Sequence, residues 1–456
     1  MTATLTPRTQ DGRAQSGRAR NGPTGRSGRR AAATATTPAT LRTLMIVLVL
    51  LSLLWGAFGG WVASQHSSAA SALTGVDEPL SLDARQMYAS IADADVTITT
   101  AFLVSSAPQL AVLQHYQFDI AGASADLAKL QRGGASESQA ANAALQTLVE
   151  SLPVYTGYVA DAESEYSLGF PLTGGSFLQV ASEEAHLVLL PNANTVFTQE
   201  NAALAAASSQ ATGLPTVIAA LVLALVTAIV LLRAQRWLTR RTNRVFSAGL
   251  VLASLALLIS VVWIAAGFLA ARSNLDNGID HGSSPAQSLA QASIKVQQIR
   301  GDAVLNVISR SGGTSFSTDF LTAKALVGPG SGSLLAAAAA AETGGSPAAN
   351  LVAAAGQQAT SWYTANGTVY TLGNASDYRH ERDAVIGTQA GSSAAGYKVL
   401  EGDIESAIGD DQTTFENAAS AGANALDPLE PVVITASLLM AIGSAWGLSR
   451  RLAEYR

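Results

Sequence analysis

Apolar and polar residues alternate along this chain in long blocks. Four of the blocks contain no Asp, Glu, Lys, Arg or His. They span residues 43–64, 215–232, 245–270 and 431–448. Each block is long enough to cross the hydrocarbon layer of a membrane as an α-helix, which needs about 17–25 residues. The pattern therefore predicts four transmembrane helices.

The segments between these blocks have a different pattern. In residues 65–214 and 271–430, Ala alternates with Leu or Val, and extended β-branched runs are few, which favours helices over strands. Helix breaks are expected in the first segment at Pro108, Gly133–Gly134, Pro171, Gly174–Gly175 and Pro191, and in the second at Gly312–Gly313, Gly328–Gly332 and Gly344–Gly345. Four or five helices then form the first segment, which is typical of a helical bundle. The predicted fold is all-α, with four transmembrane helices and two tandem helical-bundle domains.

Basic residues give this arrangement an orientation. Residues 233–244, between the second and third apolar blocks, contain five arginines and no acid. Loops rich in Arg and Lys remain on the cytoplasmic side of a membrane. We therefore expect this turn to be cytoplasmic and both bundles to be extracytoplasmic.

The remaining charge follows the same division. Residues 1–42 carry eight arginines against Asp11 alone and have almost nothing apolar to bury, so we expect a disordered cytoplasmic tail. Such a tail contacts anionic lipid headgroups or docks a cytoplasmic partner. Residues 449–456 carry three arginines and are expected to form a cytoplasmic C-terminus. The two bundles keep the other 11 basic residues against 31 acids, which makes them strongly negative.

Short sequences recur in the two halves at similar spacings. The sequence Glu-Asn-Ala-Ala begins at Glu200 and again at Glu416, and in both copies the proline that opens the next apolar block lies 14 residues past the Asn. Ala-Ala-Asn begins at Ala140 and again at Ala348, and in both copies Tyr-Thr follows 13 residues past the Asn. These matches predict an internal duplication of one unit.

The sequence lacks the patterns that carry catalysis, transport or metal binding. No Cys is present, and no two of the five histidines are spaced i, i+3 or i, i+4, so we expect five ordinary histidines and no metal site. The apolar blocks hold only Ser and Thr as polar residues, which argues against a transporter. The glycine-rich segment at 328–333 has no Lys after it, unlike a phosphate loop. We therefore expect no enzyme activity, no cofactor and no nucleic-acid partner.

Two groups of residues are candidates for partner binding, because aromatic and Arg side chains are enriched in protein interfaces. The candidate extracytoplasmic surface comprises Trp362, Tyr363, Tyr370, Tyr378, Arg379 and Arg382. Its counterpart in the first half comprises Tyr155, Tyr158 and Tyr166. The alternative is structural, since Tyr155 and Tyr158 have core spacing and the two arginines have acidic neighbours for salt bridges.

The candidate cytoplasmic contact comprises Arg236, Trp237, Arg240 and Arg241. Arg236 and Arg240 are spaced i, i+4 and would share one face if the helix continues past the membrane. An acidic patch on a kinase or another soluble effector would fit that face. The alternative is that these arginines serve only as a topology signal.

An Arg-rich cytoplasmic tail, four spans and two acidic helical domains, without a cytoplasmic enzyme domain, resemble the GlnX-type membrane proteins of actinobacteria. The resemblance covers the architecture from Leu44 to Leu448. It implies that the chain connects an extracytoplasmic solute-binding lipoprotein, which senses acidic amino acids, to a soluble cytoplasmic Ser/Thr kinase. It transfers no functional residue to this sequence.

The residues themselves indicate a function of the same kind. Bundles whose first and last helices enter the membrane can convert a shift of helices outside into a shift inside. With little protein in the cytoplasm, the signal has to pass to another chain. The alternative is a structural or accessory subunit of a membrane or cell-envelope assembly. The sequence leaves open the sensed solute, whether it binds directly, and whether the chain forms a homo-oligomer.

Overall fold

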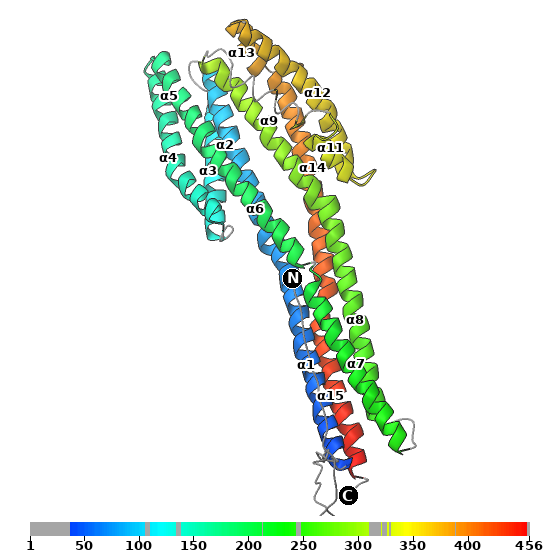
Figure 1. The fold of residues 1–456 in the computed structure, drawn as a ribbon. Helices are drawn as coiled ribbons and strands as arrows, with labels where there is room; N and C mark the ends of the chain where they lie inside the picture. The colour runs from blue at the N-terminus through cyan, green and yellow to red at the C-terminus, as the bar shows by residue number, and fades with distance from the viewer. Residues whose placement is uncertain are drawn as a thin grey trace, which may run out of the picture.

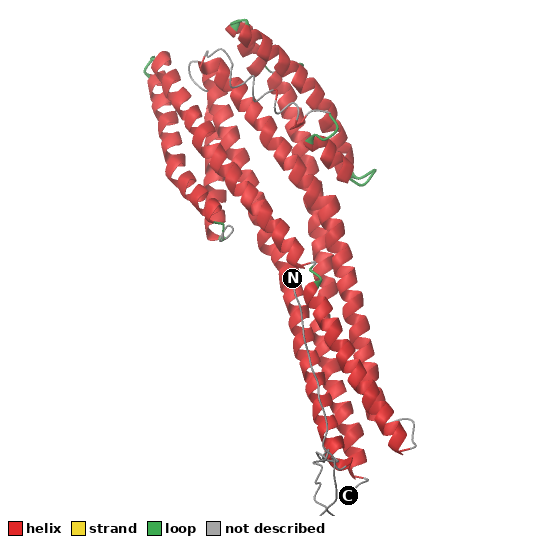
Figure 2. Cartoon of the chain, viewed as in Figure 1, coloured by secondary structure: helices red, strands yellow, loops and turns green. Residues whose placement is uncertain are grey.

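The computed structural model is almost entirely α-helical over the residues that it describes (Figure 1, Figure 2). These are residues 37–104, 110–133, 138–211, 213–242, 248–309, 321, 326–327, 330–387 and 389–453. No strand occurs among them, which confirms the predicted all-α fold. Some predictions fall on residues outside these ranges. They are the disordered tail up to residue 36, the helix breaks at Pro108, Gly134, Gly312–Gly313 and Gly328, and the role of Arg244.

Four helices run side by side and form a long stem (Figure 1). They are α1 (Thr37–Ala72), α7 (Pro215–Thr242), α8 (Ala248–Gly278) and α15 (Leu429–Ala453). Apolar side chains fill the inside of the stem around Trp55 and also cover its outside, where Leu50, Leu225 and Ile442 are more than half exposed. Such helices suit a lipid environment. The four candidate spans predicted from the sequence are therefore present.

The other helices form two lobes at one end of the stem (Figure 1). The first lobe consists of α2 (Glu78–Val104), α3 (Leu110–Arg132), α4 (Gln139–Ser167), α5 (Pro171–Glu184) and α6 (Leu190–Ala211). The second consists of α9 (Ser284–Ser309), α11 (Leu334–Ala341), α12 (Pro347–Asn374), α13 (Tyr378–Ile386) and α14 (Ser393–Leu426). One continuous cluster of buried side chains extends from Ile91 and Leu148 in the first lobe to Trp362 and Leu400 in the second. The two lobes therefore share a single hydrophobic core.

Two stem helices continue into the lobes without a break. The π-helical segment η1 (Leu73–Asp77) joins α1 to α2, and η3 (Ile279–Ser283) joins α8 to α9. The first of these continuous helices includes Thr40–Phe102, 63 residues, or roughly 95 Å at 1.5 Å per residue. This length is about three times the thickness of a hydrocarbon layer. Only the stem part of each helix can therefore lie in a membrane, and the lobes lie outside it.

A proline follows each π-helical segment at the second residue of the next helix. Pro79, Pro191 and Pro285 follow η1, η2 (Ala185–Leu189) and η3, respectively. Proline has no backbone N–H, and in a regular α-helix its ring clashes with the carbonyl four residues earlier. The wider π turn moves that carbonyl away and lets the helix continue. The predicted break at Pro191 is therefore wrong.

The predicted break at Gly174–Gly175 is also wrong, because both glycines lie inside α5. A Cβ atom on Gly174 would come within 2.6 Å of the ring of Tyr166. Glycine is thus present here because α5 packs closely on the end of α4. The structure does have turns at Gly133, at Gly169 before Pro171, and at Gly344–Gly345, where breaks were predicted.

Two helix ends differ from the predicted boundaries. α1 begins at Thr37, within the segment predicted to be a disordered tail, and α7 continues to Thr242, through most of the predicted turn at 233–244. Ala234 and Leu238 are buried in the stem, so α7 keeps its packed face beyond the apolar block. Gln235 donates hydrogen bonds to the carbonyl oxygen of Leu250 and to the Oγ of Ser254, at 3.1 and 2.8 Å, and so fixes α7 against α8.

Three glycines let α8 and α15 cross closely in the stem. A Cβ atom on Gly249 would lie 2.6 Å from the backbone nitrogen of Gly447, and one on Gly443 would lie 2.8 Å from the carbonyl oxygen of Gly249. Both obstacles are backbone atoms, which cannot rotate away. Small residues at such crossings are typical of helices that associate in membranes.

We expect Gly249→Ala to separate α8 from α15 and to destabilise the chain by about 1–3 kcal/mol, the usual effect of overpacking. Gly60→Ala is the matched control, because its Cβ atom would meet Ile434 at an ordinary 3.7 Å. The control should unfold at or slightly above the wild-type temperature, since Ala favours a helix more than Gly does. Thermal unfolding in detergent measures both variants, and equal melting temperatures for them would contradict the proposed packing.

Candidate functional site between the lobes

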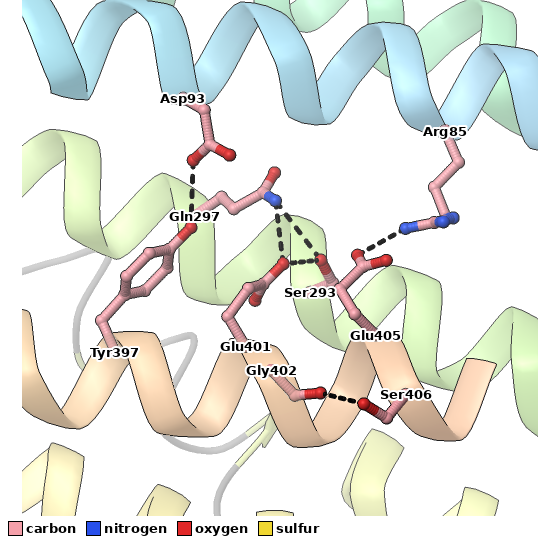
Figure 3. A network of polar contacts seen from close by, with 9 residues as sticks. All are labelled: Arg85, Asp93, Ser293, Gln297, Tyr397, Glu401, Gly402, Glu405 and Ser406. Atoms are coloured by element: carbon pink, nitrogen blue, oxygen red, sulfur yellow. Dashed lines mark hydrogen bonds and ion pairs between the residues drawn. The ribbon is translucent and has the colours of Figure 1, made fainter. Parts of the chain in front are cut away.

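Polar side chains cross the boundary between the lobes, where α2 faces α9 and α14 (Figure 3). Arg85 on α2 forms an ion pair with Glu405 on α14, with 2.5 Å between Nη1 and Oε1. Two turns along α2, Asp93 accepts a hydrogen bond of 3.3 Å from the hydroxyl of Tyr397 on α14. We call this boundary the seam. These two contacts fix the register of α2 against α14.

Glu401 lies between the two contacts, on the α14 side of the seam (Figure 3). The hydroxyl of Ser293 and the amide of Gln297, both on α9, donate hydrogen bonds to its Oε1 at 2.6 and 3.0 Å. Burial raises the pKa of Glu401 to about 8, although these two donors act in the opposite direction. The carboxyl group is therefore largely protonated at neutral pH.

A half-buried histidine also joins the two lobes. His186 lies in η2, and its Nε2 is 3.4 Å from Asp95 on α2 while its Nδ1 is 3.2 Å from Asp302 on α9. Asp95 in turn accepts a hydrogen bond of 2.8 Å from Ser182. Burial lowers the pKa of His186, but the hydrogen bonds and charges of Asp302 and Asp95 outweigh burial and raise this pKa to about 10. An imidazolium cation thus bridges two carboxylates at neutral pH.

Gly301 makes the approach of His186 to α9 possible. A Cβ atom at position 301 would lie 2.7 Å from Cε1 of the imidazole ring. Any larger residue would therefore move the ring away from Asp302, the next residue in the chain. The local sequence Gly301-Asp302 supplies both the space and the charge for this bridge.

The structure corrects part of the predicted extracytoplasmic surface. Trp362 and Tyr363 are only 0 and 4 % exposed, and the indole Nε1 of Trp362 donates a hydrogen bond of 3.2 Å to the carbonyl oxygen of Ser393. Both side chains belong to the shared core, because α12 packs against α14 there. The prediction that they contact a partner is therefore wrong.

The other members of that group lie nearer the surface. Tyr370 is half-buried, whereas Tyr378, Arg379 and Arg382 are exposed at the start of α13, and Arg382 pairs with its neighbour Asp383 at 2.8 Å. Partner binding by these residues stays a prediction. In the first lobe Tyr155 is fully buried, while Tyr158 and Tyr166 are half-buried, so the structural alternative holds for Tyr155.

The arginines predicted to contact a cytoplasmic partner lie at the end of the stem that is far from the lobes (Figure 1). Arg233, Arg236 and Arg240 are exposed on α7, and we call them the arginine face. Trp237 is half-buried and packs against the stem interior. The side chain of Arg241 is outside the described part of the chain. Because α7 remains helical here, Arg236 and Arg240 do share one side of a helix.

Four of the five histidines have ordinary local roles. His66 binds the carbonyl oxygen of Ala211, and His281 binds that of Ala341. His115 lies beside Asp119 on the same helix, and His380 lies beside Asp377, the N-cap residue of its helix. Within the described ranges, no group of three or more His, Asp or Glu side chains could hold a metal ion. His186 differs from these four, because it bridges two carboxylates from different helices.

Comparison with known proteins supports a sensing role for the first lobe. Residues 69–209 match the family model of an actinobacterial sensor domain. The match runs from the last residues of α1 to α6 and so includes His186, Asp95 and the whole α2 side of the seam. No curated protein and no solved structure matches the chain. The chain thus contains a segment similar to the sensor domains of actinobacterial proteins, and a sensing or signalling function follows from this match.

The bridge through His186 predicts a specific pH dependence of stability. Its folded-state pKa lies above the value of an unfolded histidine, so the bridge stabilises the fold fully below about pH 6.5 and loses this contribution as the pH rises to about 10. His186→Gln leaves the buried Asp95 and the half-buried Asp302 without a cation and should destabilise the chain by about 3 kcal/mol near neutral pH. The difference in melting temperature between wild type and His186→Gln should shrink steadily from pH 6.5 to pH 10.

The difference between variants is the quantity to measure, because other groups titrate in the same range. Burial raises the pKa values of Glu401 and Asp411 to about 8, and both carboxyl groups remain in both proteins. His380→Gln is the matched control, since His380 is exposed beside Asp377. It should follow the wild-type curve. A gap between wild type and His186→Gln that stays constant over this range would rule out the charged bridge.

Proposed function

We propose that the chain is a non-enzymatic transmembrane adaptor, which relays amino-acid sensing by an extracytoplasmic solute-binding lipoprotein to a cytoplasmic Ser/Thr kinase. One observation carries the proposal: two helices extend without a break from the seam, through the stem, to the end that bears the arginine face. The match of the first lobe to a sensor domain supports the input side of this relay.

The contacts of the seam support a mechanism in which helices shift relative to one another. α2 continues into α1, α9 into α8, and α14 leads into α15 through one turn at Asp427–Pro428. A ligand or partner that moves α2, α9 and α14 relative to one another therefore acts on three stem helices at once. Small translations of packed helices are an established form of signal transfer. A movement of α8 also moves α7, because Gln235 on α7 forms hydrogen bonds with α8.

Charge supports the orientation of the proposed relay. The arginine face lies at one end of the stem, and the acidic lobes lie at the other. The positive-inside rule assigns the arginine end to the cytoplasm. The exposed residues Tyr378, Arg379 and Arg382 on α13 lie at the end of the second lobe farthest from the stem (Figure 1), where a solute-binding lipoprotein has free access.

Thiol labelling in intact cells tests this orientation, since the chain has no native Cys. Ser164→Cys in the first lobe and Thr343→Cys in the second place single thiols at exposed positions. Both should react with a membrane-impermeant maleimide, whereas Thr239→Cys beside the arginine face should react only after the cells are opened. Reaction of Thr239→Cys alone in intact cells would invert the topology.

Replacement of Arg236 and Arg240 by Gln tests the output surface. Arg233, Arg241 and Arg244 remain as topology signals, so insertion should be normal. Capture of a cytoplasmic Ser/Thr kinase in mild detergent should weaken about tenfold, because two exposed ion pairs contribute at most about 1 kcal/mol each. The residual capture should depend less on salt concentration.

The matched control for this experiment is Arg132→Gln, which removes an exposed arginine from the first lobe. It should capture the kinase as the wild type does. Normal insertion of the double variant together with full, equally salt-sensitive capture would show that the arginine face is a topology signal and not an output surface.

A further inference from the structure

A cleft opens at the seam, where α2 and α3 of the first lobe meet α9 and α14 of the second. Its volume is about 650 Å³, which lies within the usual range for small-molecule sites. Asp93 and Thr97 of α2, His115 of α3, Arg300 of α9, and Tyr397 and Lys398 of α14 contribute its polar lining. The cleft therefore draws residues from both lobes.

Arg300 is the unusual member of this lining. It is only 4 % exposed, and its Nη1 donates a hydrogen bond of 2.6 Å to the carbonyl oxygen of Val385. Among the described residues, no carboxylate lies within 4.0 Å of its guanidinium group. A buried cation without a counter-ion is costly to a fold, and the guanidinium group presents five N–H donors, more than one carbonyl oxygen can accept.

The charge of the cleft is opposite to that of its surroundings. The lobes as a whole carry far more acids than bases. The cleft nevertheless contains Arg300 and Lys398 against a single acid, Asp93. Burial raises the pKa of Asp93. A locally positive cleft in an acidic body favours an anionic ligand.

We propose that this cleft binds a small organic carboxylate, whose charged group is held by the guanidinium of Arg300. The planar guanidinium matches the two oxygens of a carboxylate and forms strong charge-assisted hydrogen bonds with them. Val96 and Val112 add aliphatic surface to the cleft, which fits the hydrocarbon part of an organic acid better than an inorganic ion. Tyr397, whose hydroxyl donates a hydrogen bond to Asp93, also lines the cleft.

This proposal rests on the proposed sensing function and deepens it by naming a ligand class. A carboxylate on Arg300 of α9 also contacts residues of α2 and α14, so its binding changes the relative position of three helices. Those helices lead into α8, α1 and α15 of the stem. The ligand would thus act directly on the elements that carry the signal.

Fluorine NMR of the purified full-length chain in lipid nanodiscs tests the proposal, with trifluoropropionate as the probe. Wild-type protein should broaden the probe signal, and unlabelled propionate should restore it. Trifluoropropionamide, which has the same shape without the charge, should not broaden. Arg300→Gln keeps a donor for the carbonyl of Val385 but removes the charge, and it should bind the carboxylate at least about tenfold more weakly.

Two further variants decide the result if Arg300→Gln does not fold. Thr97→Phe fills the cleft from α2 without a change of charge and should abolish binding, while Lys398→Gln at the exposed rim should weaken binding about two- to threefold. Arg132→Gln, an exposed arginine at the end of α3 outside the cleft, is the matched control and should bind as the wild type does.

Three results would overturn the proposal. They are equal broadening of the carboxylate and its amide, unchanged binding by the folded cleft variants, and displacement of the probe by inorganic phosphate at lower concentration than by propionate. The experiment contains no partner chain. A negative result in this experiment would therefore contradict the carboxylate site but not the relay to the kinase. Loss of kinase capture would contradict the relay but not the carboxylate site.

Discussion

An ionisable group that is wholly or partly shielded from water is costly to a fold unless it meets an opposite charge or gives up its own, and this constraint determines most of the polar contacts between the two lobes. His186 meets it with Asp95 and Asp302, and Arg85 meets it with Glu405. Glu401 meets it by remaining protonated between Ser293 and Gln297. Each of these solutions depends on a particular register of α2 against α9 and α14. A shift of one helical turn would leave charges unpaired inside the seam.

The shared hydrophobic core limits the kind of movement that the lobes can make. Buried side chains extend from one lobe into the other without interruption, so full separation would expose a large apolar area to water. Movement at the seam is therefore restricted to small sliding or rotation of helices that stay in contact. The crossing at Gly249, Gly443 and Gly447 restricts the stem in the same way, because its backbones are already in contact. A body of this construction transmits small displacements over a long distance.

The sequence predicts the fold well, because helical periodicity and uninterrupted apolar blocks are local properties. The four candidate spans and the all-α architecture follow from composition alone. The seam does not, because His186 is separated from Asp95 and Asp302 by about a hundred residues on either side. No local spacing reveals such a contact. Trp362 and Tyr363 show the opposite error, since composition that is typical of an interface is equally typical of a packed core.

The wrong prediction at Pro191 has a physical explanation that also concerns signal transfer. Proline is expected to end a helix, yet Pro79, Pro191 and Pro285 each follow a π turn that relieves the clash of the ring with the preceding carbonyl. Two of these turns, η1 and η3, lie where the stem meets the lobes. A π turn adds one residue to a helix and so rotates the face that follows. The same continuous helix can therefore present an apolar surface all round in the stem and a one-sided polar surface at the seam. At each of these two junctions, the π turn and the proline after it keep the helix continuous and rotate the face that it presents.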